Sequence, residues 1–134
     1  MIAYTDGSSI GNPGPAGWAV VLEGELVSDW LPHASNNEAE LYAILQAVML
    51  CPPGIELSIY TDSKLAIGWL CWSWRIRSRR IAALAQAHFA VVDAKELIVR
   101  LYKVKGHSGS KENERADRAA KAQARIAQSL LSVR

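Results

Sequence analysis

The spacing of hydrophobic residues changes repeatedly along this chain, between the alternation typical of strands and the period of three to four residues typical of helices. Strands are expected at residues 2–5, 18–24, 25–31, 55–61 and 96–104. Helices are expected at residues 34–54, 62–72, 74–95 and 108–131. This order, with strands first and strands and helices interleaved afterwards, belongs to the α/β class and favours a mixed sheet covered by helices.

Turn-forming and capping residues set the expected boundaries of these elements. The segment 7–17, GSSIGNPGPAG, is expected to be a loop because it is rich in glycine, proline and serine. Asn36 or Asn37 is expected to cap the first helix, and the Pro-Pro-Gly sequence at 52–54 ends it. The buried stripe of this helix is expected to consist of Leu41, Ile44, Leu45 and Val48.

Composition narrows the class of protein. A chain of 134 residues, half of them hydrophobic, is expected to form a single domain with its own core. A net charge of only +2 means that any surface for nucleic acid must be a local concentration of basic residues. Cys51 and Cys71 are isolated and no signal peptide is evident, so a reducing cytoplasm is the expected location. No apolar run reaches the length of a membrane span, so no membrane partner is expected.

Two acidic residues come at the ends of expected strands. Asp6 follows the first strand, and Asp62 follows the strand after the first helix, where Asp62 or Ser63 also serves as a helix cap. Strands joined through one helix usually pair in parallel, which brings their carboxyl ends to the same sheet edge. Carboxylates that repel one another at such an edge suit a divalent cation with hard oxygen ligands, Mg²⁺ or Mn²⁺.

Further acids on the helices could complete this site. Glu38 and Glu40 point roughly 200° apart on the first helix, so periodicity alone leaves the choice between them open. Asp117 lies at the edge of the inner face of the last helix. Each acid also has an ordinary explanation, because Asp6 can cap a turn, Asp62 can cap a helix, and solvent can surround the others.

Four motifs of this chain resemble those of type 1 ribonuclease H. They are, in order, YTDGSSIGNPGPAGW, SNNEAEL, IYTDSKLAI and VKGHSGSKENERAD, and together they extend over nearly the whole sequence. The resemblance implies a ribonuclease H-like fold, with a central five-stranded mixed sheet flanked by helices. It also implies one catalytic domain over residues 1–134 with no separate hybrid-binding domain.

The resemblance further implies an endonuclease that hydrolyses the RNA strand of RNA–DNA hybrids. Two Mg²⁺ ions, with Mn²⁺ as a substitute, are implied as cofactors, and the products would carry 5′-phosphate and 3′-hydroxyl ends. The implied metal ligands and catalytic acids are Asp6, Glu40, Asp62 and Asp117. The motif spacing selects Glu40 over Glu38, and His107 is implied to move protons or assist product release, although a histidine beside glycine can also be a plain loop residue.

Contacts to the substrate are implied for polar residues near these acids. Asn12, Asn36 and Asn37 would contact the minor groove of the hybrid, and turn formation or helix capping is compatible with that role. The implied set also includes backbone groups near the metal site, at Gly7 and Ser8, and Lys64, where a glutamine is common in the family.

A tryptophan- and arginine-rich segment is the second candidate for nucleic-acid contact. It spans residues 68–80, and its short arginine cluster stands where some family members have a lysine-rich protrusion after the helix that corresponds to 63–72. Arginines bind phosphate and aromatic rings stack on bases, although core tryptophans and solvated arginines would look the same in sequence. Lys121 and Arg125 of the last helix are an alternative basic surface, and Glu38 stands where some relatives have arginine.

Hybrid cleavage is the leading function for a chain expected to act as a monomer on RNA–DNA hybrids. The alternatives are binding of nucleic acid by an inactive module on the same fold, a structural domain once joined to a polymerase, and a related nuclease of other substrates. The presence of all four acids favours cleavage.

Overall fold

The computed structural model describes residues 1–104 and 110–132. Its strands are β1 (Ile2–Ser9), β2 (Gly14–Leu22), β3 (Glu25–Ala34), β4 (Glu56–Thr61) and β5 (Ile98–Lys103). Its helices are α1 (Asn36–Leu50), α2 (Lys64–Cys71), α3 (Arg79–Ala94) and α4 (Lys111–Leu131). This order of elements is the expected one, and no helix within the described ranges is long and apolar enough to cross a membrane.

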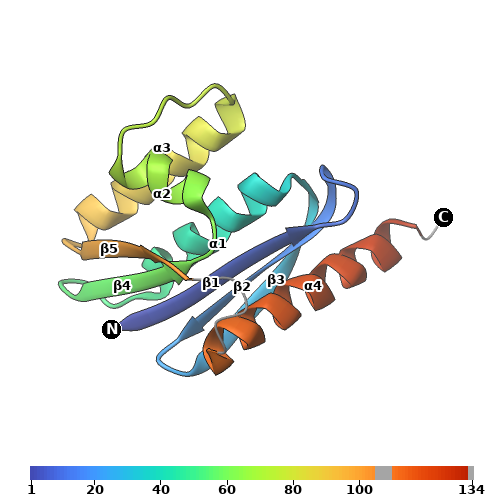
Figure 1. The fold of residues 1–134 in the computed structure, drawn as a ribbon, viewed down its shortest axis with the longest axis horizontal. Helices are drawn as coiled ribbons and strands as arrows, with labels where there is room; N and C mark the ends of the chain where they lie inside the picture. Colours follow the sequence, from blue (N-terminus) through green and yellow to red (C-terminus); the bar gives the residue numbers. More distant parts are fainter. Residues whose placement is uncertain (105–109, 133–134) are drawn as a thin grey trace.

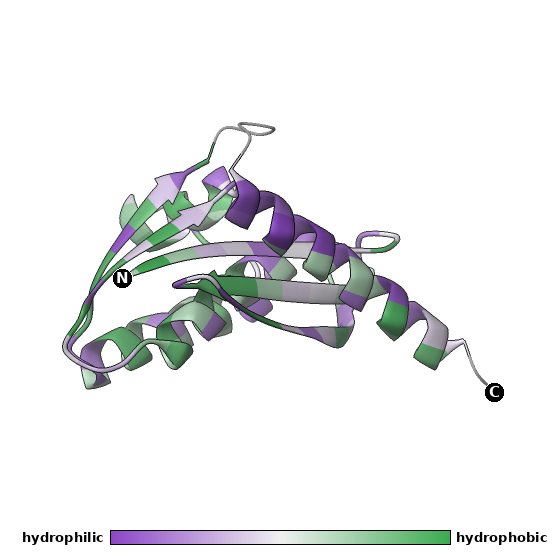
Figure 2. Ribbon diagram, turned by 90° about the horizontal axis from the view of Figure 1, so that it is seen from below, coloured by the Kyte–Doolittle hydropathy of each residue, from purple (hydrophilic) through white to green (hydrophobic). Residues whose placement is uncertain are grey.

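The strands form one five-stranded mixed sheet in the order β3-β2-β1-β4-β5, which confirms the expected fold class (Figure 1). The three N-terminal strands are antiparallel neighbours, whereas β4 pairs in parallel with both β1 and β5. Figure 2 shows the sheet between two helical layers, with α1 and α3 below it and α4 above it. The central strand β1 therefore has helices on both of its faces.

Apolar residues fill both interfaces between the helices and the sheet. The four stripe residues expected on α1 are all buried against the sheet, at Leu41, Ile44, Leu45 and Val48. On the opposite face α4 uses small residues, and its Ala116 and Ala120 pack on Ala19 and Val21 of β2. Alanine allows a helix to lie close to a sheet, so the acids that α4 carries are held near β1.

Strand β1 is longer than the sequence indicated. Asp6 was expected at the end of a strand and Gly7 in a loop, but β1 continues to Ser9. The reason is the hairpin with β2, whose pairing runs on to Ser9 and Ala16, while pairing with β4 stops at Tyr4 and Tyr60. Asp6 therefore lies inside a strand that has lost its parallel neighbour.

Helix α1 is fixed at both ends. The expected caps Asn36 and Asn37 were wrong, because Ser35 is the N-cap and forms a reciprocal capping box with Glu38. At the other end the Lys95 ammonium donates to the carbonyls of Val48 and Cys51 at 3.0 and 2.8 Å, and also to that of Met49. A cation at a helix C-terminus satisfies free carbonyls and opposes the helix dipole, so α1 is held firmly in place.

Helix α3 starts later than the helical spacing indicated. The expected helix over residues 74–95 begins only at Arg79, with Ser78 as its N-cap. Residues before the cap instead fold back on α2, where the Trp74 N–H donates to the Gly68 carbonyl at 3.0 Å. Residues 73–78, with Arg75 and Arg77, thus form an irregular connection between α2 and α3.

Replacement of His88 by leucine is expected to stabilise the fold. His88 is buried on α3, its Nδ1 has no hydrogen-bond partner among the described residues, and burial lowers its pKa to about 4 from the ordinary 6.5. The unfolded chain therefore binds more protons between these values, so wild-type stability falls as the pH drops from about 6.5 to about 4. We expect a gain of about 1 kcal/mol at pH 7 from removing the unpaired group, and a larger gain at pH 5.

Urea denaturation of His88→Leu at both pH values measures this difference. His33→Leu is the matched control, because His33 is exposed on β3. A pH-independent difference between His88→Leu and wild type would contradict the prediction.

Candidate metal and nucleic-acid site

The register of the parallel strands places two acids side by side. Tyr4 of β1 pairs with Tyr60 of β4, and two residues further along each chain come Asp6 and Asp62. Asp6 shares a face of β1 with Tyr4. Asp62 follows directly after β4 ends at Thr61, and carboxylate oxygens of the two acids lie within 4.8 Å of each other. The expected juxtaposition of these two carboxylates is therefore present in the structure.

Helix α1 adds a third acid because its backbone touches β1 at a glycine. A Cβ on Gly7 would lie 2.3 Å from the backbone carbon of Ala39 and 2.4 Å from the nitrogen of Glu40. Only the absence of a side chain at Gly7 permits this approach. Glu40 thereby reaches the carboxyl end of β1, whereas Glu38 is occupied in the capping box.

Asp6, Glu40 and Asp62 form one compact cluster. Each offers a carboxylate oxygen, and these oxygens lie within 4.8 Å of one another. Asp6 is 6% exposed and Glu40 is 9% exposed, while Asp62 is open to solvent. Like charges this close, two of them removed from water, would destabilise the fold unless a proton or a cation compensates them.

When no cation is bound, protons compensate the repulsion among these carboxylates. Burial is the main reason that the pKa of Asp6 rises to about 7, and Asp62 and Asp117 raise it further, while Glu40 and the Gly7 N–H act the other way. Burial, followed by Asp6 and Asp62, raises the pKa of Glu40 well above its ordinary value. The cluster thus retains protons near neutral pH.

The cluster fits a divalent metal ion. All its donors are carboxylate oxygens, the ligands that Mg²⁺ and Mn²⁺ prefer. The buried Oε2 of Glu40 has no hydrogen-bond partner among the described residues, so one acceptor is available for a cation. Within the described ranges, no other group of histidine, cysteine or acidic side chains is arranged in this way.

Asp117 lies at the margin of the cluster. It is partly buried on α4 and close enough to Asp6 to raise the pKa of that residue. Its Oδ2 lies 3.2 Å from the Lys121 ammonium one helical turn later. Asp117, the fourth expected acid, is therefore at the same end of the sheet as the cluster. Its carboxylate pairs with a lysine, and it is not one of the three acids whose oxygens lie within 4.8 Å of one another.

The asparagines expected to contact substrate connect the β1–β2 turn to α1. The Asn12 Oδ1 accepts from the Asn36 N–H, and the Asn36 Oδ1 accepts from the Ser9 N–H, both at 2.9 Å. Asn37, next on the same helix, is exposed. The turn and the start of α1 therefore form one joined surface beside the acids.

The remaining expected site residues occupy varied environments. The Gly7 N–H donates to the Asp6 Oδ1 at 2.9 Å, and Ser8 is partly exposed on β1. Lys64 is exposed at the start of α2. His107 lies outside the described residues.

The arginine-rich segment forms a hollow with the start of α1. A cavity of about 360 Å³ is lined by Asn37, Trp69, Arg75 and Arg77, among others. Arg80 reaches Glu38, and its Nε lies 3.1 Å from the Glu38 Oε2. This ion pair could not be foreseen from the sequence, and it compensates the negative charge at the position where some relatives carry arginine.

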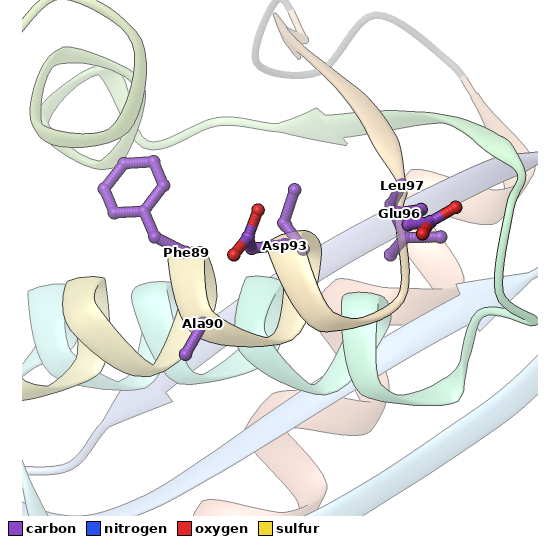
Figure 3. Close-up of a pocket in the computed structure, with 6 residues that line it drawn as sticks. Phe89, Ala90, Asp93, Glu96 and Leu97 are labelled. Carbon is purple, nitrogen blue, oxygen red and sulfur yellow. The ribbon is translucent and has the colours of Figure 1, made fainter.

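A second hollow of about 620 Å³ lies away from these residues, at the junction of α3 and β5. Figure 3 shows Phe89, Asp93 and Glu96 around it. Neither acid belongs to the carboxylate cluster. Cavity size alone therefore does not mark the reactive part of this molecule.

Comparison with known proteins gives one consistent result. The model of the RNase H family matches residues 1–125. A ribonuclease H from Rhizobium etli is 35% identical over 131 residues, which cover 88% of this chain and 87% of that protein.

Solved structures show the same fold. The N-terminal RNase H domain of a Mycobacterium tuberculosis protein, solved as a fusion with maltose-binding protein, has a TM-score of 0.81 and 24% identity over 98% of this chain and 97% of that one. LC11-RNase H1, solved in complex with an RNA/DNA hybrid, has a TM-score of 0.78 and 22% identity over 95% and 98% of the two chains.

The stability of the metal-free protein is expected to fall as the pH rises. Asp6 has a pKa of about 7 in the folded chain against an ordinary 3.8, so the folded state binds more protons between these values and loses stability as they are released. Glu40→Gln removes one charge from the cluster and should make this decline shallower. Melting temperatures in chelator at pH 5, 6, 7 and 8 measure the effect.

Addition of Mg²⁺ should raise the melting temperature more at pH 8 than at pH 5, since the deprotonated cluster binds the ion. Parallel pH profiles for wild type and Glu40→Gln would contradict the prediction. Glu56→Gln, on an exposed acid elsewhere in the sheet, is the control and should follow the wild-type profile.

Proposed function

This chain belongs to the ribonuclease H family, and we propose that it cleaves the RNA strand of RNA–DNA hybrids at the cluster of Asp6, Glu40 and Asp62, with Asp117 as a fourth ligand. The observation that carries the proposal is the convergence of three carboxylates within 4.8 Å at the end of the central parallel strands. The chain is a ribonuclease by its family membership. The metal requirement, the identity of the substrate and the ends of the products are our proposals.

The four acids would together hold two divalent ions, Mg²⁺ or alternatively Mn²⁺. Such ions activate the attacking water and stabilise the leaving 3′ oxygen, which gives 5′-phosphate and 3′-hydroxyl products. The protein contributes a preorganised site, because β1, α1 and α4 each supply one acid from a packed element and Asp62 follows directly after β4. Asp6 and Glu40 are almost fully buried, so their carboxylates would be held with little water around them.

Lys121 has a further consequence for Asp117. Its ammonium lies 3.2 Å from the Asp117 Oδ2, so this ion pair would help to orient the acid before substrate arrives. We also propose that His107 moves protons or assists product release.

The hybrid would lie across the start of α1. The surface joined by Asn12 and Asn36, with Asn37 beside it, faces the acids and offers amide groups suited to 2′-hydroxyls and base edges. Arg75 and Arg77 line the same cavity as Asn37 and are suited to phosphates of the DNA strand. The likeness in fold to a protein solved with an RNA/DNA hybrid supports this substrate.

Asp62→Asn is expected to reduce cleavage of a labelled RNA–DNA hybrid by at least about 100-fold, the scale of a lost electrostatic contribution to catalysis, while hybrid binding is kept. The fold should remain, because the variant lowers repulsion in the cluster. Cleavage assays with hybrid, double-stranded RNA and double-stranded DNA, each with Mg²⁺ or Mn²⁺, measure this effect.

Asp93→Asn, at an exposed acid on α3, is the matched control and should cleave like wild type. Undiminished cleavage by Asp62→Asn would reject the site. Wild-type protein that binds the hybrid but leaves it intact would instead favour the inactive binding module.

Arg75→Gln and Arg77→Gln are expected to weaken hybrid binding uniformly across sequences. Each lost phosphate contact should reduce the slope of log affinity against log salt by roughly one. Titrations of a labelled hybrid at several salt concentrations measure both quantities. Arg125→Gln, on the exposed face of α4, tests the alternative basic surface, and a larger loss there than at Arg75 would contradict our assignment.

A further inference from the structure

Three tyrosines stack across three adjacent strands. The ring centroids of Tyr4 and Tyr60 lie 5.0 Å apart with 17° between their planes, and those of Tyr60 and Tyr102 lie 5.2 Å apart with 26° between theirs. The three residues are direct partners in the parallel register of β1, β4 and β5. The rings therefore form one continuous stack perpendicular to the strands.

The stack is closed at one end and open at the other. Tyr4 packs against the small residues with which α4 contacts β2, so the helix covers the inner end. Helix α4 crosses β1, β2 and β3, whereas β4 and β5 extend beyond it (Figure 1). Tyr102 lies on the last strand of the sheet and is 42% exposed. No strand in the described ranges pairs with β5 on its outer side, and the partly exposed Tyr102 ring ends the stack there.

The open end lies close to the carboxylate cluster. Tyr60 comes two residues before Asp62, which follows directly after β4 ends at Thr61. Tyr102 is the partner of Tyr60 on β5, so with strands about 4.8 Å apart and about 3.3 Å per residue, the Cα atoms of Tyr102 and Asp62 are separated by roughly 8 Å. A chain bound at the acids therefore passes near Tyr102 within one or two units.

A positive charge accompanies the exposed ring. Arg100 precedes Tyr102 by two residues on β5 and points to the same side of the sheet. Its Nη1 lies 3.4 Å from the Glu56 Oε2, and both side chains are more than half exposed. Surface pairs of this kind are weak, so Arg100 remains accessible to a phosphate.

We propose that Tyr102 stacks on a nucleobase of a single strand that continues beyond the hybrid, next to the site of cleavage. The inference rests on the proposed function, because it assumes that a polynucleotide occupies the acids. A base is flat and apolar on its faces, and it would continue a stack that already has parallel rings about 5 Å apart. Arg100 would then contact the backbone of the same strand.

The test compares hybrids that differ only outside the duplex. Fluorescence anisotropy with Mg²⁺, in an Asp62→Asn background that prevents cleavage, gives the affinity for a blunt hybrid, for one with a single-stranded RNA extension and for one with a DNA extension. We expect the hybrids with an extension to bind more tightly than the blunt hybrid. Tyr102→Ala should weaken binding of the extended hybrids by about 10-fold, the scale of one base–aromatic stack. Binding of the blunt hybrid should not change.

Matched variants separate stacking from other effects. Tyr102→Phe keeps the ring and should behave like the parent protein, and Phe89→Ala removes an exposed ring on α3 and should have no effect. If Tyr102→Ala loses affinity for both extended hybrids, the base itself is the ligand. If it loses affinity for only one of them, that extension identifies the strand that passes over Tyr102. Equal affinities of the parent and Tyr102→Ala for all three substrates overturn the inference.

A failure of the proposed function can be distinguished from a failure of the inference about Tyr102. If the wild-type chain does not cleave the blunt hybrid, that function is wrong, and binding of isolated single-stranded RNA and DNA by wild type and Tyr102→Ala then decides the role of Tyr102. About 10-fold weaker binding by the variant supports stacking, and unchanged binding overturns it.

Discussion

Repulsion among Asp6, Glu40 and Asp62 is the constraint on which the rest of this structure depends. Two of the three carboxylates are almost fully buried, and their oxygens lie within 4.8 Å of one another. Such an arrangement persists only if the surrounding fold forces it, because each group would otherwise turn toward water. Free energy stored in this way is released when a cation binds, so the same packing that destabilises the empty site favours metal binding.

Different kinds of contact hold the elements that carry the acids in place. Strand β1 is held by pairing on both sides, and α1 by the Ser35 capping box at its start and the Lys95 ammonium at its end. Glycines allow the helices to touch the sheet, since a Cβ on Gly17 would lie 2.2 Å from the Ala120 carbonyl oxygen of α4, as one on Gly7 would clash with α1. Loss of any one of these contacts would shift one acid relative to the others.

Much of this arrangement could be predicted from the sequence, and the limits have physical causes. Element order and the apolar stripe of α1 follow from local periodicity, and the motifs identified the acids. Strand register is not local, so neither the extension of β1 past Asp6 nor the tyrosine stack could be predicted. Ser35 and the asparagines are equally good caps, and only the approach of the β1–β2 turn gives Asn36 another partner. The ion pair of Glu38 with Arg80 joins helices that are distant in sequence.

The β2–β3 pairing contains an irregularity near the end of β3, and it affects contacts between copies of the chain. Strands β3 and β5 are the two borders of the sheet, where free backbone groups can template intermolecular β-structure. Pro32 lies where the β2–β3 register shifts between Gly14 and Ala16, and it has no N–H to offer an incoming strand. The β5 border carries Arg100 and Lys103, whose charges repel an identical border. Pro32 on β3 and the basic side chains on β5 are thus features that oppose pairing of these borders with a second copy.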